Sequence, residues 1–110
     1  MIKIFLKRDK EGFIKEFSIK GHAGYARRGK DIVCAGVSAI ALTALGALEE
    51  LAGICSFSEK RGNVKCSIPE NISRDAKEKA RIILDTMAIG FKMIEREYKD
   101  YVLVLDDKEV

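Results

Sequence analysis

The feature that most constrains the fold is an uncharged, mostly apolar segment at residues 32–48. It is slightly shorter than a membrane span needs, and Ser38 and Thr43 interrupt it. We therefore expect a buried helix over residues 31–51, capped by Asp31 and ending near Gly53. Such a helix requires a sheet or another apolar surface to cover it.

Strand patterns occur on both sides of this helix. Apolar and polar residues alternate in four short segments that are joined in pairs by glycine-containing turns. The expected elements are strands 2–6 and 13–20, helix 31–51, strands 54–60 and 64–68, a helix from a Ser73 cap to Tyr98, and strand 101–105 before an acidic tail at Asp106 and Asp107. The order β-β-α-β-β-α-β predicts a two-layer α+β domain with a mainly antiparallel sheet.

Length and composition place this fold in a single domain spanning residues 1–110. Three cysteines without a C-x-x-C pair, and a first strand that starts at once, predict a reducing, cytoplasmic location. The net charge is +3, with basic residues spread over both hairpins and both helices, so no nucleic-acid partner is required. No cofactor, metal or membrane is expected.

The first helix is apolar around nearly its whole circumference. Small residues recur at every fourth position in Ala35, Ala39, Thr43 and Ala47. One sheet face cannot cover a whole helix, so we expect the surplus to pack against a second copy in a homodimer. The alternative is that loops cover it.

Nucleophilic chemistry is suggested by His22, the only histidine, and Cys34 at the start of this helix. A thiolate in the first helical turn gains roughly 0.3–1 kcal/mol from the helix dipole. This is too little to ionise the thiol alone, so an imidazolium must supply the remainder. The same helix end could receive the oxyanion of an acyl-transfer intermediate. From these residues alone, the alternative is a surface or capping histidine.

Asp31 and Ser38 each have two interpretations. Asp31 is a helix cap, or it orients His22 as the third member of a triad; the cap is favoured. Ser38 lies one turn beyond Cys34, where its hydroxyl bonds within the site or to the carbonyl one turn back.

The loop between His22 and Cys34 is rich in glycine and positive charge. It could order around a substrate as a lid, or it could be an ordinary solvated loop. The candidate substrate residues are Gly21, Gly24, Tyr25 and Gly29, and the charges are Arg27, Arg28 and Lys30.

Two other interpretations are disfavoured. Residues 24–31 nearly match the phosphate loop G-x-x-x-x-G-K-[ST], but Asp31 replaces the hydroxyl and β-α-β alternation is absent. A zinc site formed by Cys34, Cys55, Cys66 and His22 is disfavoured because none of their spacings along the sequence matches a known pair of zinc ligands. Cys55 and Cys66 are instead expected in the core, where free cysteines are common.

Residues 21–25, Gly-His-Ala-Gly-Tyr, and residues 29–38, with Asp31, Cys34 and Ser38, resemble the signature of the bacterial ribosomal-processing cysteine proteases, the Prp family. The similarity extends over the whole length and element order. It implies a cytoplasmic endopeptidase that removes an N-terminal extension from large ribosomal subunit protein 27.

By this resemblance Cys34 is the nucleophile and His22 the general base, supported by Asp31 and Ser38. The resemblance also implies a homodimer. The competing class is a non-enzymatic, ribosome-associated binding module whose basic residues contact RNA.

Overall fold

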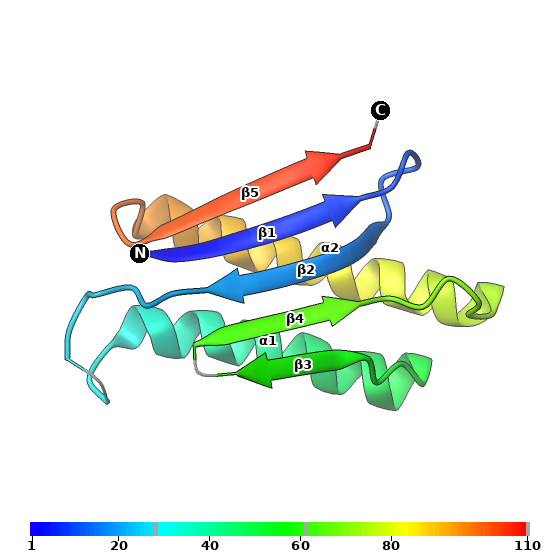
Figure 1. The fold of residues 1–110 in the computed structure, drawn as a ribbon, viewed down its shortest axis with the longest axis horizontal. Helices are drawn as coiled ribbons and strands as arrows, with labels where there is room; N and C mark the ends of the chain where they lie inside the picture. Colours follow the sequence, from blue (N-terminus) through cyan, green and yellow to red (C-terminus); the bar gives the residue numbers. More distant parts are fainter. Residues whose placement is uncertain (28, 61, 110) are drawn as a thin grey trace.

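The computed structural model describes residues 1–27, 29–60 and 62–109, and within them it has the predicted order of strands and helices (Figure 1). Arg28, in the basic loop, and Arg61, in the second hairpin turn, lie outside the described residues. The elements are β1 (Ile2–Arg8), β2 (Ile14–Lys20), α1 (Ile32–Ala52), β3 (Phe57–Lys60), β4 (Asn63–Ser67), α2 (Arg74–Glu97) and β5 (Val102–Lys108).

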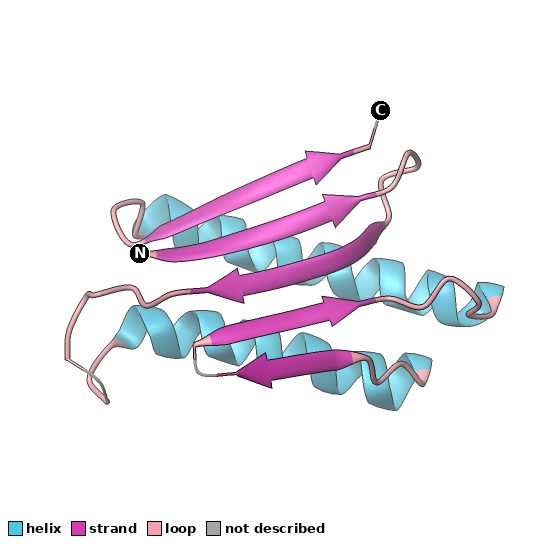
Figure 2. Ribbon diagram, viewed as in Figure 1, coloured by secondary structure: helices cyan, strands magenta, loops and turns pink. Residues whose placement is uncertain are grey.

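The five strands form one sheet in the order β3-β4-β2-β1-β5. Every neighbouring pair is antiparallel except β1 and β5, which run parallel. Both helices cover the same face of this sheet (Figure 2). The predicted two-layer α+β domain is therefore confirmed, with a mixed sheet that is mainly antiparallel.

The two largest differences between predicted and observed strand boundaries come from interactions outside the local pattern. Gly53 has φ +68° and its N–H donates to Glu49, while the Ile54 N–H donates to Leu48, so both residues complete the end of α1. β3 consequently starts at Phe57 instead of residue 54. At the other end of the chain, the expected acidic tail is part of β5, which pairs with β1 as far as Lys108.

The core lies between the helices and the inner sheet face. Strand side chains such as Ile4, Leu6 and Phe17 are fully buried there, against Leu48 of α1 and Phe91 of α2. Within the described chain, α1 alone is long and apolar enough to cross a membrane, with a mean hydropathy of 1.9. Core helices share that property, and the inward side chains of α1 belong to the hydrophobic core.

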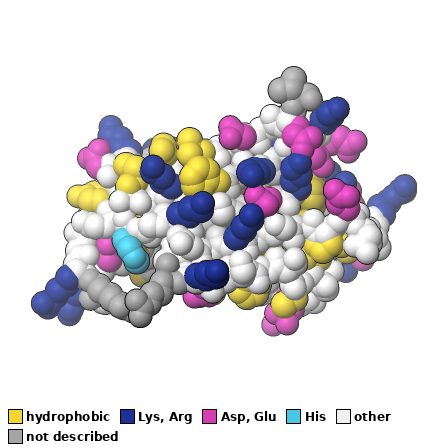
Figure 3. All heavy atoms as spheres, viewed as in Figure 1, with side chains coloured by type: hydrophobic (Ala, Val, Ile, Leu, Met, Phe, Trp, Pro, Cys, Tyr) yellow, Lys and Arg dark blue, Asp and Glu magenta, His cyan; other side chains and the backbone are white. Residues whose placement is uncertain are grey.

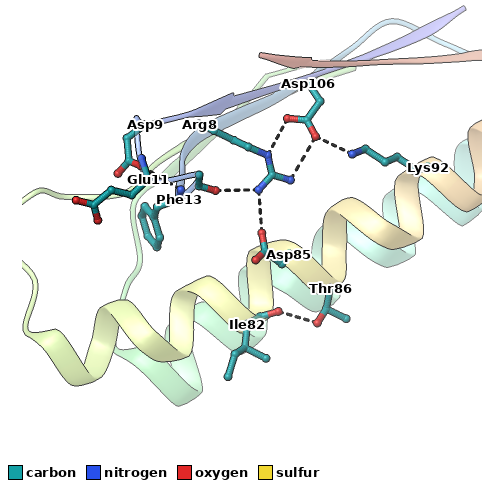
Figure 4. A network of polar contacts seen from close by, with 10 residues as sticks. Arg8, Asp9, Glu11, Phe13, Ile82, Asp85, Thr86, Lys92 and Asp106 are labelled. Atoms are coloured by element: carbon teal, nitrogen blue, oxygen red, sulfur yellow. Dashed lines mark hydrogen bonds and ion pairs between the residues drawn. The ribbon is translucent and has the colours of Figure 1, made fainter. Parts of the chain in front are cut away.

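A cluster of charges joins β1 and β5 to α2 (Figure 4). The guanidinium of Arg8 donates to both carboxylate oxygens of Asp106, at 2.8 and 3.3 Å, and to Asp85 at 3.0 Å. Arg8 also donates to the carbonyl of Gly12, and Lys92 donates to Asp106 at 2.7 Å. Hydrogen bonds from Arg8 and Lys92 lower the pKa of Asp106, while its partial burial opposes them.

Replacing Arg8 by methionine tests this cluster. We expect the free energy of unfolding at pH 7 to fall by roughly 1–3 kcal/mol, because charged hydrogen bonds to two carboxylates are lost. Since the pKa of Asp106 is lowered in the folded state, its contribution is present above pH 4 and is lost as the pH falls through the folded-state pKa. Urea unfolding from pH 7 to pH 2 measures both effects.

The matched control is Lys79→Met, which removes an exposed pair with Asp75 on the same helix. It should cost only about 0.3–0.5 kcal/mol. A loss in Arg8→Met that stays constant down to pH 2 would show that the arginine stem, not its charge, stabilises the contact.

Candidate active site

The loop that carries His22 leaves β2 through a backbone position that only glycine can occupy. Gly21 has φ +90°, and a Cβ there would lie 2.5 Å from the carbonyl oxygen of Met1. The backbone at Gly21 therefore packs closely against the carbonyl group of Met1 before the chain enters the loop. Gly24 and Gly29 also have positive φ, in open space.

Asp31 is the N-cap of α1, as the sequence predicted. One carboxylate oxygen accepts the N–H groups of Val33 and Cys34, both at 3.0 Å. The other accepts the N–H groups of Tyr25 at 3.1 Å and Ala26 at 3.4 Å. These bonds, foremost the one from the Cys34 N–H, lower the pKa of Asp31. One side chain therefore joins the loop to the helix, and no hydrogen bond links the described Asp31 to His22.

Cys34 is half-buried in the first turn of α1. Its sulfur accepts the backbone N–H of Ala23 at 3.3 Å. An N–H dipole directed at the sulfur favours negative charge there, in addition to the helix dipole. Because Ala23 directly follows His22, this bond also holds the loop backbone of the histidine beside the thiol.

His22, Cys34 and Ser38 line one pocket of about 260 Å³. It lies where the loop and the β3–β4 hairpin meet at the same end of the sheet (Figure 1). Its remaining lining residues are Ile2, Ile19, Gly21, Val37, Ala41, Leu42, Leu45, Glu59, Lys60, Gly62, Asn63 and Val64. The wall from α1 is apolar, and the hairpin contributes a charged and amide-bearing rim.

The His22 ring is exposed and packs against the hairpin at Gly62. A Cβ at Gly62 would lie 3.2 Å from both Cε1 and Nε2 of the imidazole, so glycine leaves room for the ring. His22 and Cys34 share the pocket without a hydrogen bond between these two described side chains. Nucleophile–base contacts are often longer before substrate binds, and the arrangement is compatible with a dyad.

The structure differs from two expectations, one about the N–H groups at the start of α1 and one about the hydroxyl of Ser38. The N–H groups of Val33, Cys34 and Ala35 are not free for an oxyanion, since Val33 and Cys34 donate to the Asp31 carboxylate and Ala35 donates to the Asp31 carbonyl. The exposed Ser38 lines the pocket, and its hydroxyl forms no hydrogen bond with the residues that the structure describes.

Tyr25 points away from the pocket. Its ring packs edge-to-face on Tyr98 and Tyr101, with centroids 5.7 and 5.2 Å apart. The sequence pattern did not predict this contact, because Tyr25 is distant along the chain from Tyr98 and Tyr101. Together with Asp31, the cluster gives the described part of the loop two attachment points.

The remaining cysteines do not line the pocket. Cys66 is a core residue as expected, and burial raises the pKa of its thiol to about 11. Cys55, in contrast, is exposed in the segment between α1 and β3, so its expected core position is wrong. Asp106, expected in an acidic tail, accepts hydrogen bonds from Arg8 and Lys92.

The β3–β4 hairpin contributes pocket residues that the sequence analysis did not single out, namely Glu59, Lys60, Gly62 and Asn63. Nothing local distinguishes them. They reach His22 only because β4 pairs with β2, a contact that places Asn63 opposite Lys20.

Comparison with known proteins agrees with this arrangement. The sequence model of the family described as cysteine protease Prp matches residues 1–103. The ribosomal processing cysteine protease Prp of Bacillus subtilis is 35% identical over 107 residues, covering 94% of this chain and 96% of the relative. The enzyme of the same name from Staphylococcus aureus is 28% identical over 109 residues, covering 93% and 95%.

Solved structures give the same result. The S. aureus protease Prp in complex with a covalently linked product peptide has a TM-score of 0.80 and 26% identity, covering 97% of this chain and 100% of that one. SMU.848 from Streptococcus mutans has a TM-score of 0.80 and 26% identity, covering 99% and 96%. From its sequence, fold and pocket, this chain belongs to the Prp family of ribosomal-processing cysteine proteases.

Proposed function

We propose that this chain is an endopeptidase that removes the N-terminal extension of large ribosomal subunit protein 27, with Cys34 as nucleophile and His22 as general base. The observation that supports this most directly is the environment of Cys34. Its sulfur lies at the positive end of α1, accepts the N–H of Ala23, and shares a pocket with the only histidine.

In the proposed reaction His22 accepts the thiol proton and the Cys34 sulfur attacks the scissile carbonyl carbon. In this proposal the Ala23 N–H, which donates to the sulfur, also donates to the developing oxyanion. Collapse breaks the C–N bond, and the imidazolium gives its proton to the leaving amine. Water, deprotonated by His22, then attacks the thioester and releases the carboxylate and the thiol.

The pocket fits a peptide with an apolar side chain. Val37, Leu42 and Leu45 of α1 form its wall, while Glu59 and Lys60 lie on the hairpin rim. A relative of the same fold was solved with a covalently linked product peptide, which supports peptide cleavage here. The three free cysteines, one of them the nucleophile, fit a cytoplasmic location.

We also propose a homodimer through the helical face. On the side away from the sheet, α1 and α2 enclose an apolar groove of about 470 Å³ that includes Ala39, Ala47 and Gly90. Ile82 lines this groove and remains 68% exposed, as do Ile89 at 61% and Met93 at 57% on the same side of α2. A patch of this kind marks an interface between proteins. The proposed dimer face therefore includes α2 in addition to α1, the helix that the sequence analysis named.

The first test is cleavage of the N-terminally extended ribosomal protein, followed by mass spectrometry. We expect Cys34→Ala and His22→Ala each to lower kcat/KM by roughly 10³-fold or more, because the nucleophile or its base is lost. Cys55→Ala is the matched control and should cleave normally, since Cys55 lies outside the pocket.

Thiol labelling gives this test an independent readout. At pH 6 half-buried Cys34 should alkylate faster than exposed Cys55, and His22→Ala should remove the difference. Cleavage by Cys34→Ala would show that Cys34 is not the nucleophile. Slow and equal labelling of both cysteines would contradict the dyad and favour a non-enzymatic binding module.

The role of Asp31 is tested by comparing two replacements. Asp31→Ser keeps one cap acceptor but loses the oxygen that binds Tyr25 and Ala26, whereas Asp31→Ala loses both. We expect the alanine variant to have the lower Tm, and both variants to lose about 10- to 100-fold in kcat/KM through misplacement of the loop.

The pH dependence separates the cap from a triad. Because the pKa of Asp31 is lowered, its stabilising contribution is present above pH 4 and is lost as the pH falls through the folded-state pKa. The activity profile near neutral pH should keep its midpoint in both variants. A shifted midpoint would instead show that Asp31 stabilises the His22 imidazolium.

For the dimer, we expect Ile82→Glu combined with Ile89→Glu to give a folded monomer in sedimentation equilibrium, because both side chains are exposed within one chain. Leu103→Glu on the sheet face is the control and should leave the mass unchanged. A wild-type monomer at micromolar concentration would contradict the proposal.

A further inference from the structure

The strand register gathers lysines that are scattered in the sequence. Lys3 of β1 lies opposite Lys20 of β2, which lies opposite Asn63 of β4, and Asn63 lies opposite Lys60 of β3. Residues directly opposite one another project from the same sheet face. All four are exposed, and they form one polar row across four strands.

The neighbouring rows extend this surface. Phe5, Ser18, Lys65 and Ser58 form the second row, and Lys7 and Glu16 belong to the third. We define the basic sheet face as Lys3, Lys7, Lys20, Lys60 and Lys65. Glu16 pairs with Lys7 at 3.2 Å and approaches Lys65 at 3.7 Å. Lys3, Lys20 and Lys60 have no ion-pair partner among the described residues.

The basic sheet face encloses a shallow pocket of about 310 Å³. The half-buried ring of Phe5 lies in it, with the ammonium of Lys20 at 5.6 Å from the ring centroid. Figure 3 shows Lys and Arg side chains across the middle of this strand face, which neither helix covers. Basic residues are spread over both helices and the loops as expected, but five of the 20 gather on this sheet face, which the sequence alone did not predict.

Like charges directly opposite on neighbouring strands destabilise a sheet. Lys3 and Lys20 form such a pair. An anionic partner converts this repulsion into attraction, since each phosphate that it brings neutralises an ammonium and releases a counterion. A basic segment of a ribosomal protein would be repelled by the same surface.

We propose that the basic sheet face binds single-stranded RNA. The ammonium groups of Lys3, Lys20 and Lys60 contact successive backbone phosphates, and a base stacks on Phe5. A β-sheet that combines a positive surface with an aromatic ring is suited to unpaired strands, whose bases are free to stack. The face lies opposite the helical face, so a dimer leaves it open.

The test measures binding of a labelled, mixed-sequence single-stranded RNA by fluorescence anisotropy at increasing NaCl. For three phosphate contacts, log K should fall with log salt with a slope of about −2. The triple variant Lys3→Gln, Lys20→Gln and Lys60→Gln should bind at least about 10-fold more weakly at 50 mM salt, with a slope closer to zero.

The matched control is Lys10→Gln, Lys79→Gln and Lys99→Gln, which removes the same charge from exposed positions outside the face. It should change affinity by less than about 2-fold. Phe5→Leu should weaken binding by about 5-fold or more while it leaves the salt slope unchanged, because stacking is lost but phosphate contacts remain.

Three outcomes would overturn the proposal. These are no RNA binding at 50 mM salt, equal losses in the triple variant and its control, or equally tight binding of a poly-glutamate peptide of matched charge. The last outcome would identify an acidic protein as the partner. Since the measurement does not involve cleavage, a failed protease assay would leave its result unaffected.

Discussion

The site depends on the carboxylate of Asp31, which binds the backbone of two segments at once. Its two oxygens accept N–H groups from the first turn of α1 and from residues 25 and 26 of the loop. With the loop held there, the Ala23 N–H reaches the sulfur of Cys34 and His22 enters the same pocket. A carboxylate close to a thiolate would ordinarily oppose its charge. Here four N–H groups donate to the Asp31 carboxylate and compensate that negative charge, so the cap is compatible with the role proposed for Cys34.

This arrangement also changes where the oxyanion can be received. The N–H groups of Val33, Cys34 and Ala35 already donate to Asp31, so these three are not available to an oxyanion, and the helix contributes chiefly its dipole. The donor that remains close to the sulfur comes from Ala23, on the loop. In the proposed reaction, activation of the thiol and binding of the developing charge therefore both require the loop backbone to be in place. The edge-to-face packing of Tyr25 on Tyr98 and Tyr101 gives that backbone a second attachment, outside the pocket.

Local patterns predicted most of the fold and the centre of the site. Alternation gave the strands, and the Asp31 and Ser73 caps gave both helix starts, because each signal acts over a few residues. What depends on distant pairing could not be predicted. The parallel contact of β5 with β1, the position of Gly62 beside His22, and the tyrosine cluster all join residues far apart in the chain. The core position predicted for Cys55 was wrong because the hydrogen bonds that end α1 extend to Ile54, so β3 starts only at Phe57 and Cys55 lies in the connection before it.

The lysines of the sheet show that strand register can produce a positively charged surface that is not evident from the amino-acid composition. A net charge of +3 is small, and the basic residues look dispersed along the sequence. Pairing of β1, β2, β4 and β3 nevertheless aligns Lys3, Lys20 and Lys60. Shifting any one strand by one residue would turn its lysines toward the core, so the apolar residues that fix the register also fix this surface. Lys20 is followed directly by Gly21 and His22. An anion bound along the row would therefore lie at the end of the strand that carries the histidine, on the opposite side of the sheet from the helices that form the proposed dimer face.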